Sequence, residues 1–214
     1  MKIALLGAES TGKTQLSQAL AEHLLGMGRS VTVVAEVLRE WCEQHGRTPR
    51  EAEQLAIAQE QARRVDAAAA TSDIVIADTT PLMIAVYSAM LFGDESLYDF
   101  ALAHQRSYTL TLVTGLDIPW EADGLQRDGP HVREPVDSLV RAALERAGIV
   151  FKVVYGTGRE RLANALLAMA ASTAMREGLL ANWSWSCDKC SDPECEHRLF
   201  TGLLRSKAAG RPSP

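Results

Sequence analysis

The sequence is poor in the features that mark secreted and membrane-spanning proteins. Among its 214 residues are only four cysteines, and aromatic residues make up 6%. Four cysteines are too few for a disulfide scaffold at this length. No apolar run reaches the ~18 residues of a membrane-spanning helix, and the amino terminus lacks the long apolar core and cleavage site of a signal peptide. These absences favour a reduced, cytoplasmic protein without a membrane partner.

The charge is modest and slightly acidic. Twenty-seven acidic residues against 22 basic ones give a formal net charge of −5 and a pI of about 5.6. This balance argues against general nucleic-acid binding through a broad basic surface. Hydrophobic residues at 47% and charged residues at 23% are typical of globular proteins, and the length suits one domain with or without an appendage.

Short β-branched or apolar runs alternate with helical patterns over the first 172 residues. Five such runs separated by helices predict a parallel sheet with helices on both faces, which is a three-layer α/β/α sandwich. The alternation stops near Thr173, so we expect a domain at residues 1–172 and a different appendage at 173–214. The expected strands are Lys2–Leu6, Val31–Ala35, Ile74–Ala77, Leu110–Thr114 and Phe151–Tyr155.

Helical periodicity and start signals fill the intervals between these strands. Thr48, Pro49 and Glu51 form a helix start signal with a capping box, and the helix that follows runs into the alanine cluster Ala67–Ala70. Residues 115–134 are rich in glycine, proline and charge and predict a mobile loop. The other expected helices are Gln15–Leu25, Arg39–Gln44, Pro81–Phe92, Ser96–His104, Pro135–Ala147 and Arg159–Ala171.

A phosphate-binding loop is the most specific motif in the chain. Residues 7–14 fit the pattern G-x-x-x-x-G-K-[ST], with a predicted strand before them and a helix after them. Backbone N–H groups of such a loop face the phosphates, the lysine reaches the β- and γ-phosphates, and the threonine hydroxyl ligates Mg²⁺. The motif predicts nucleoside triphosphate binding, with ATP as cofactor, through Gly7, Ala8, Glu9, Ser10, Thr11, Gly12, Lys13 and Thr14.

Acidic residues follow the second and third predicted strands. Asp78 comes directly after Ile74–Ala77, where P-loop proteins commonly place a carboxylate that holds Mg²⁺ or activates the acceptor; a helix-capping role is the alternative. Glu36, Arg39 and Glu40 are spaced to share one helix face. They predict an acceptor site in which a carboxylate takes the hydroxyl proton, and a solvated charge cluster is the alternative.

The 115–134 loop carries arginines and aspartates opposite the expected phosphate loop. Closure of a lid would bring a guanidinium onto the transferring phosphoryl group and exclude water. We expect Arg127 to act there, Arg133 to contact the nucleotide and Asp123 to contact the acceptor. The alternative is a polar surface loop.

Several separated segments together resemble the NadR-type P-loop kinases, a kind of AAA-type ATPase domain, over about residues 1–172. These segments are GAESTGKT at residues 7–14, Glu36-x-x-Arg39-Glu40, Asp78-Thr79-Thr80, and the run DIPWEADGL at residues 117–125 that leads to Arg127.

The resemblance implies a ribosylnicotinamide kinase activity that uses ATP and Mg²⁺ in NAD biosynthesis. Lys13 and Thr14 would then bind triphosphate and metal, Glu36 and Arg39 would face the acceptor, and Asp78 would lie at the reacting centre. The family often places its arginine directly after D-G-L, whereas this chain has Gln126 there, followed by Arg127.

Three cysteines and a histidine crowd the carboxyl-terminal appendage. Four such ligands are the number that tetrahedral Zn²⁺ prefers, so a structural zinc site is one interpretation. A redox-active C-x-x-C pair and an unstructured tail with incidental thiols are the others. The ligands would be Cys187, Cys190, Cys195 and His197.

Three functions therefore compete. The first is a small-molecule kinase that transfers the γ-phosphoryl group of ATP to a nucleoside-type hydroxyl, with Glu36 or Asp78 as base. The second is a regulatory ATP-binding module that acts on a protein partner through the tail. The third is a zinc-dependent interaction protein on a P-loop scaffold. The sequence leaves homo-oligomer formation open.

Overall fold

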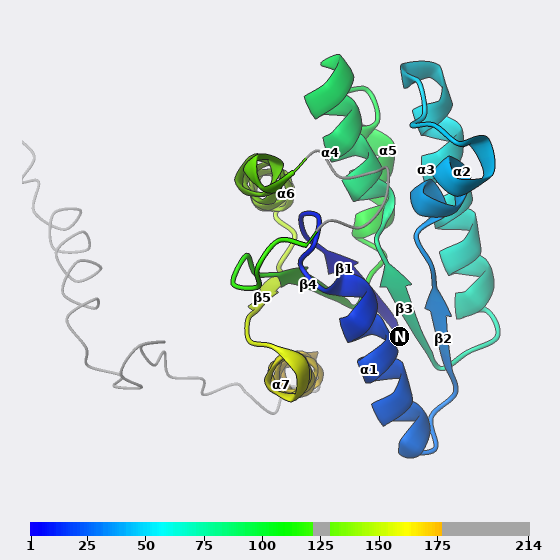
Figure 1. The fold of residues 1–214 in the computed structure, drawn as a ribbon. Coiled ribbons are helices and arrows are strands. Elements are labelled where there is room, and N and C mark those ends of the chain that lie inside the picture. The colour runs from blue at the N-terminus through cyan, green and yellow to red at the C-terminus, as the bar shows by residue number, and fades with distance from the viewer. Residues whose placement is uncertain (122–128, 177–214) are drawn as a thin grey trace, which may run out of the picture. The chain divides into compact units, whose positions relative to one another are not determined.

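Five parallel strands form the central sheet of the computed structural model, which describes residues 1–121 and 129–176. The strand order is β2-β3-β1-β4-β5, and each neighbouring pair is parallel (Figure 1). The predicted α/β/α architecture is confirmed. The strands are β1 (Lys2–Leu6), β2 (Val31–Val34), β3 (Ile74–Asp78), β4 (Leu110–Thr114) and β5 (Lys152–Val154).

Helices connect the strands as crossovers, which is how parallel neighbours must be joined. All the predicted helices are present: α4 has the expected ends, and the ends of the others differ by a few residues from the sequence-based expectations. A short 3₁₀ helix, Pro130–Val132, precedes the sixth α-helix. The α-helices are α1 (Lys13–Gly26), α2 (Val37–His45), α3 (Glu51–Ala69), α4 (Pro81–Phe92), α5 (Tyr98–Gln105), α6 (Arg133–Arg146) and α7 (Gly158–Arg176).

The two faces of the sheet are covered by different helices because successive strand residues point to opposite sides. Ile3 and Leu5 of β1 pack with apolar residues of α1 and α7. Leu6 of β1 and Val113 of β4 pack on the other side, in a larger core with residues of α3, α4, α5 and α6. Figure 1 shows α1 and α7 together on one side of the sheet and α4, α5 and α6 on the other.

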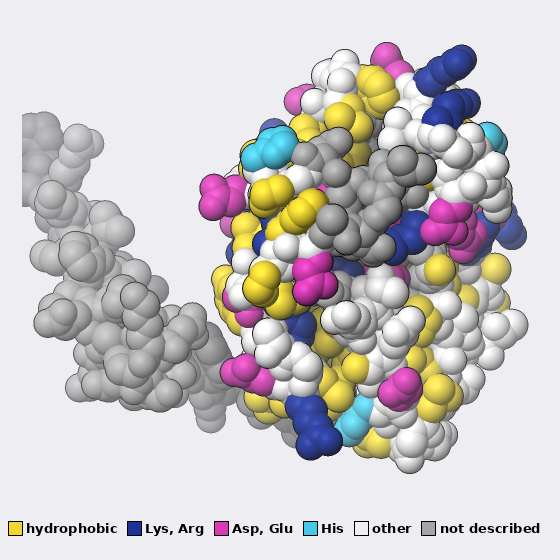
Figure 2. Space-filling model, in the orientation of Figure 1, with side chains coloured by type: hydrophobic (Ala, Val, Ile, Leu, Met, Phe, Trp, Pro, Cys, Tyr) yellow, Lys and Arg dark blue, Asp and Glu magenta, His cyan; other side chains and the backbone are white. Residues whose placement is uncertain are grey.

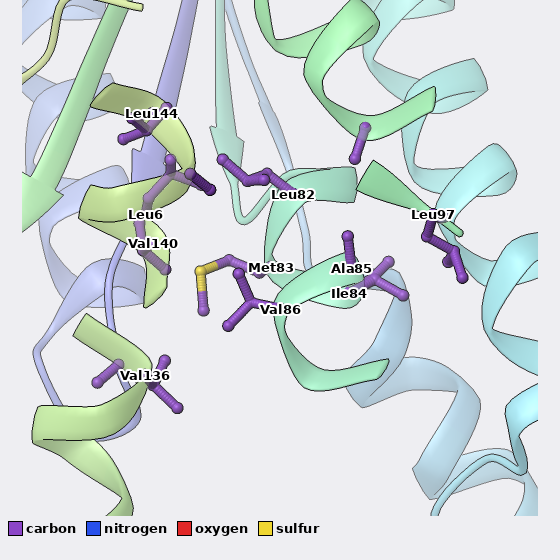
Figure 3. Packing of buried hydrophobic residues seen from close by; sticks show 14 of the residues in the cluster. Leu6, Leu82, Met83, Ile84, Ala85, Val86, Leu97, Val136, Val140 and Leu144 are labelled. Carbon is purple, nitrogen blue, oxygen red and sulfur yellow. The ribbon is translucent and has the colours of Figure 1, made fainter. Parts of the chain in front are cut away.

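Helix α4 is the centre of the larger core. Its residues from Pro81 through Val86 are all buried, so it is apolar around its whole circumference rather than along one stripe. Figure 3 shows Met83 and Val86 of α4 facing Val136 and Val140 of α6. The first half of α4 is therefore fixed by packing on all sides, and it begins three residues after Asp78.

Two of the helix starts that differ from the sequence-based expectation have a clear local cause. The helix expected from Thr48, Pro49 and Glu51 begins two residues later: Arg50 is the N-cap, and its backbone N–H donates to Glu53 Oε2 at 2.7 Å. The predicted capping box is therefore wrong by two residues. The Arg47 guanidinium also binds Glu53, at 2.7 and 2.8 Å, and this pair favours the later position.

Helix α5 begins at Tyr98 rather than at Ser96, because Ser96 belongs to a turn before the helix. The backbone N–H of Ser96 donates to Asp94 Oδ1 at 2.9 Å. Such side-chain bonds offer the backbone an alternative to helix, and they delay its start.

The segment at residues 115–134 is only partly a loop. Its last two residues open α6, and Pro130–Val132 form the 3₁₀ helix. The division into domains at 172 and 173 stays a prediction, since most of the second part lies outside the described residues. Within residues 1–121 and 129–176, no helix is long and apolar enough to cross a membrane.

Candidate functional site

Residues 7–12 form a loop between β1 and α1 whose shape requires glycine at both ends. Gly7 has a φ of 142° and Gly12 a φ of 73°, both in regions that side chains disfavour. A Cβ atom on Gly7 would lie 2.2 Å from Thr114 Oγ1, which belongs to β4. Beneath the loop, the hydroxyl groups of Thr11 and Thr114 bond to each other at 2.6 Å. The glycines of the motif therefore allow the loop to lie directly on the sheet.

Lys13 folds back over this loop. Its Nζ donates to the carbonyl oxygens of Gly7 and Ala8, at 2.9 Å each. Burial lowers the pKa of Lys13, while the negative charges of Glu36 and Asp78 oppose that shift. The lysine is thus surrounded by loop carbonyls and carboxylates, and it is placed to bind an anion that enters the loop.

Glu36 and Asp78 come from two different strands and meet at the carboxyl edge of the sheet. Glu36 is the N-cap residue of α2, two residues after the end of β2, and Asp78 is the last residue of β3. Burial raises the pKa of Glu36, and the positive charge of Lys13 partly offsets the effect. Asp78 is 4% exposed, and its Oδ1 has no hydrogen-bond partner among the described residues. A buried oxygen of this kind is suited to a ligand, ion or water.

The structure brings Arg39 to Glu36 but turns Glu40 elsewhere. Arg39 Nε lies 3.6 Å from Glu36 Oε2. Glu40 instead accepts a hydrogen bond of 2.6 Å from Arg64 Nη1 of α3. The expected three-residue acceptor cluster is thus reduced to the pair Glu36 and Arg39 in this structure, with Glu40 tying α2 to α3.

Thr79, next to Asp78, has a strained backbone. Its φ is 84°, which is unusual for a β-branched residue, and its side chain is buried with Oγ1 unpartnered in the described part of the chain. Strain of this kind costs about 1–3 kcal/mol and tends to collect at functional sites. Its backbone N–H donates to the Leu5 carbonyl at 3.2 Å, which holds the strand end in place.

Arg133 is the first residue of α6. Of the two arginines expected to contact the nucleotide from the 115–134 segment, it is the one within the described ranges. It is 8% exposed, and its Nε and Nη2 find no hydrogen-bond partner within residues 1–121 and 129–176. Burial lowers the pKa of Arg161, and the positive charge of Arg133 lowers it further. A buried guanidinium with two unpartnered nitrogens favours an anionic ligand.

Arg161 of α7 links the phosphate loop to two neighbouring loops. It donates to the backbone carbonyl of Thr11 and, through Nε, to the carbonyl of Gly156 at 2.7 Å. Its Nη2 lies 2.6 Å from Asp117 Oδ1, and Asp117 Oδ2 accepts the Gly156 N–H at 2.6 Å. Sequence reasoning missed Arg161, because an arginine in a predicted amphipathic helix gives no signal of its own.

Six of the predicted site residues lie outside the described ranges. They are Asp123 and Arg127 of the expected lid and the four expected zinc ligands, Cys187, Cys190, Cys195 and His197. Within residues 1–121 and 129–176, no three His, Cys, Asp or Glu side chains gather as a metal site. Thr14, the expected magnesium ligand of the loop, is exposed at the start of α1.

Figure 2 shows lysine, arginine, aspartate and glutamate side chains interspersed with apolar ones on one face of the molecule. The basic groups that matter for an anion are instead few and partly or fully buried. They are Lys13 and Arg133, at the carboxyl edge of the sheet, whereas Arg161 binds backbone carbonyls and Asp117.

Comparison with known proteins agrees with this geometry. Two solved structures of NadR, one in complex with NAD and AMP-PNP and one in complex with NR, share the fold with TM-scores of 0.62 and 0.63. Each is 19% identical to this chain and covers 81% of it, and the chain spans 49% of each NadR chain. The fold resemblance to NadR-type P-loop kinases is confirmed. No curated protein matches the sequence. The family model described as AAA domain matches residues 2–161, and this chain therefore belongs to the AAA domain family of P-loop nucleotide-binding proteins.

Proposed function

We propose that the chain is an ATP-dependent kinase that transfers the γ-phosphoryl group to a nucleoside-type hydroxyl, with nicotinamide riboside as the favoured acceptor. The observation that carries the proposal is the meeting of Lys13, Glu36 and Asp78 at the carboxyl edge of the sheet. A phosphate-binding lysine beside two carboxylates has the groups needed to hold a triphosphate and to take a proton from an acceptor.

The nucleotide would lie along residues 7–14, with its phosphates against the loop N–H groups and Lys13. The residues fit a magnesium ion as well: Thr14 is exposed at the start of α1, and Asp78 has a buried oxygen without a described partner. Oxygen ligands of this kind, completed by water and phosphate, are those Mg²⁺ prefers. When bound, the ion would neutralise charge on the β- and γ-phosphates.

Glu36 would act as the general base. Its raised pKa brings its proton affinity closer to that needed at neutral pH, while Lys13 and Arg39 help to keep it ionised. Arg39 would hold a polar group of the acceptor from the same side. Asp78 would orient the reacting groups from β3, which the buried helix α4 fixes behind it.

Arg133 would take the part of an arginine that stabilises charge on the transferring phosphoryl group. Its guanidinium is buried and has unpartnered nitrogens in the described part of the chain. Binding of an anion there would supply the missing partner, and a charge-assisted bond of this type contributes about 1.5–3 kcal/mol. Arg127, the lid arginine expected from the sequence, remains a second proposal for this role.

The acceptor is supported by fold likeness to NadR, whose structure in complex with NR is among those compared. At 19% identity this likeness fixes the fold and leaves the acceptor to experiment. A coupled assay with ATP, Mg²⁺ and nicotinamide riboside is the direct test. Phosphate transfer to the riboside is expected, and transfer to none of a panel of nucleosides would refute the kinase.

Lys13→Ala supplies the matched control for this assay. It should abolish transfer and leave the melting temperature close to that of the wild type, because Lys13 contacts loop carbonyls and not the apolar core. Transfer that survives this substitution would show that the phosphate loop is not the reacting site.

A further inference from the structure

Arg161 contacts the phosphate loop through the backbone carbonyl of Thr11. It lies in the first turn of α7, some 150 residues after the loop in sequence, and it is 4% exposed. Its Nη1 donates to the Thr11 carbonyl, and a Cβ placed on Gly12 would lie 3.4 Å from this same nitrogen. The guanidinium therefore contacts the loop where its backbone turns into α1.

The contact fixes the direction of a peptide group. In a trans peptide the C=O and the following N–H point in opposite directions, and no cis peptide bond occurs in the described part of the chain. With the Thr11 carbonyl held toward Arg161, the Gly12 N–H points away from Arg161. The loop glycine, with a φ of 73°, has no side chain to resist rotation of this peptide.

Two further bonds hold the guanidinium in one orientation. Nη2 binds Asp117 Oδ1 at 2.6 Å, and Nε donates to the Gly156 carbonyl at 2.7 Å. Three acceptors around one planar group suit arginine, whose donors form a rigid fork. The ammonium of a lysine, on a flexible stem, could not bind all three in this geometry. Asp117 in turn accepts the Gly156 N–H, so the loops after β4 and β5 fix the arginine together.

We infer that Arg161 is a positioning residue for triphosphate binding: it holds the Thr11–Gly12 peptide so that the Gly12 N–H faces the phosphates. The inference rests on triphosphate binding within the proposed function and is independent of the acceptor. Arg161 touches backbone carbonyls and Asp117, so it acts through the loop and not on the reacting atoms.

Arg161→Met tests this inference in the full chain. It removes the bond to the Thr11 carbonyl and keeps an unbranched apolar stem. Binding of Mg²⁺·AMP-PNP and of Mg²⁺·tripolyphosphate is measured by titration calorimetry for wild type and variant. Both affinities should fall by the same factor, about tenfold, as expected for loss of a hydrogen bond to a charged group.

Arg141→Met is the matched control. Arg141 pairs with the buried Asp137 within α6, at 2.6 Å, so this variant also loses a part-buried arginine–aspartate pair but leaves the phosphate loop untouched. Its affinities for both ligands should stay within about twofold of the wild type, a difference of under 0.5 kcal/mol.

Arg161→Lys separates charge from positioning. It keeps a cation but not the three-acceptor geometry, so it should bind both ligands almost as weakly as Arg161→Met. Wild-type affinity in either variant would overturn the inference. So would a loss for AMP-PNP without a loss for tripolyphosphate, since Arg161 would then act on the nucleoside end. Should Arg161→Met fail to fold, Asp117→Ala, which releases one side of the guanidinium, is expected to weaken both ligands, and unchanged affinities there would overturn the inference.

Absence of any AMP-PNP or tripolyphosphate binding by the wild type would overturn both this inference and the proposed nucleotide site. Absence of phosphate transfer to nucleosides, with ligand binding intact, would refute only the kinase. The two failures are therefore distinguishable in the same set of proteins.

Discussion

Substitution of Gly7 by alanine is the sharpest test of how the phosphate loop is built. The new Cβ would lie 2.2 Å from Thr114 Oγ1, and 3.1 Å from the Thr114 carbonyl oxygen. The backbone would also carry a side chain at a φ of 142°. The loop therefore has to leave the sheet, or β4 has to shift, and both break the hydrogen bond between Thr11 and Thr114.

The magnitude follows from two costs. A disfavoured backbone conformation costs about 1–3 kcal/mol, and overpacking of a tight site typically costs about 1–3 kcal/mol more. Gly7→Ala should therefore lower the free energy of unfolding by about 2–6 kcal/mol. Gly46→Ala is the control, because Gly46 has a φ of 63° and no atom within 4 Å of its virtual Cβ. Only the backbone cost remains there, about 1–2 kcal/mol.

Urea denaturation of both variants gives the two free energies, and titration with Mg²⁺·AMP-PNP gives their affinities. Gly46→Ala should bind like the wild type, whereas Gly7→Ala should bind at least about tenfold more weakly, a difference of ~1.4 kcal/mol. Removal of the clashing atom in Gly7→Ala/Thr114→Ala should recover about 1 kcal/mol or more in a double-mutant cycle. Equal destabilisation by the two glycine variants, or a cycle without coupling, would refute the reasoning.

The remaining predictions concern the acid, the second arginine, the core and the tail. Glu36→Gln should abolish transfer. The transfer rate of the wild type should fall with decreasing pH at a midpoint above 4.5, because burial raises the pKa of Glu36. A midpoint at or below 4.5 would contradict the assignment of Glu36 as the base. Since a raised carboxyl pKa makes stability fall as pH rises through it, Glu36→Gln should be at least as stable as the wild type at pH 8 in urea unfolding. Arg133→Met should weaken Mg²⁺·AMP-PNP binding or slow transfer by about tenfold or more, as for loss of a charge-assisted bond; wild-type kinetics would show that its unpartnered nitrogens serve another purpose. Leu144→Ala, at a fully buried position in the core around α4, should cost about 2–5 kcal/mol in urea unfolding, and a cost below about 1 kcal/mol would contradict the packing described. Metal analysis of the purified chain tests the zinc interpretation of the tail: one zinc per chain, lost in Cys187→Ser, would support it, and a metal-free wild type would refute it.

The fold was predictable because its signals are local and repeated. Pro81–Phe92 and Leu110–Thr114 have the same ends in the sequence-based expectation and in the structure. In α4 a threonine N-cap precedes Pro81 and a glycine follows Phe92, so the sequence itself marks both ends. The start of α3 was less predictable. The sequence favoured a capping box of Thr48 with Glu51, but in the structure Glu53 forms the box with Arg50 and also binds Arg47.

The candidate site was predictable where it follows strands and not where it depends on side-chain direction. The ends of β2 and β3 placed Glu36 and Asp78 correctly at one edge of the sheet. Helical spacing alone grouped Glu40 with them, but Arg64 of α3 binds it instead. Arg161 and the strain at Thr79 depend on contacts between distant segments, which a single sequence does not reveal.

The burial of α4 has a consequence for protein engineering. Asp78 is the last residue of β3, three residues before a helix whose first six residues are all buried. Altering the chemistry at Asp78 through its neighbours in α4 would disturb the whole core, since packed interiors respond to changes of a single methylene. Helix α2 is a better region for variation, because Leu38, Arg39 and Glu40 are only partly buried and the helix carries Glu36 at its start. Libraries designed to change the acceptor should therefore vary α2 and keep α4 constant.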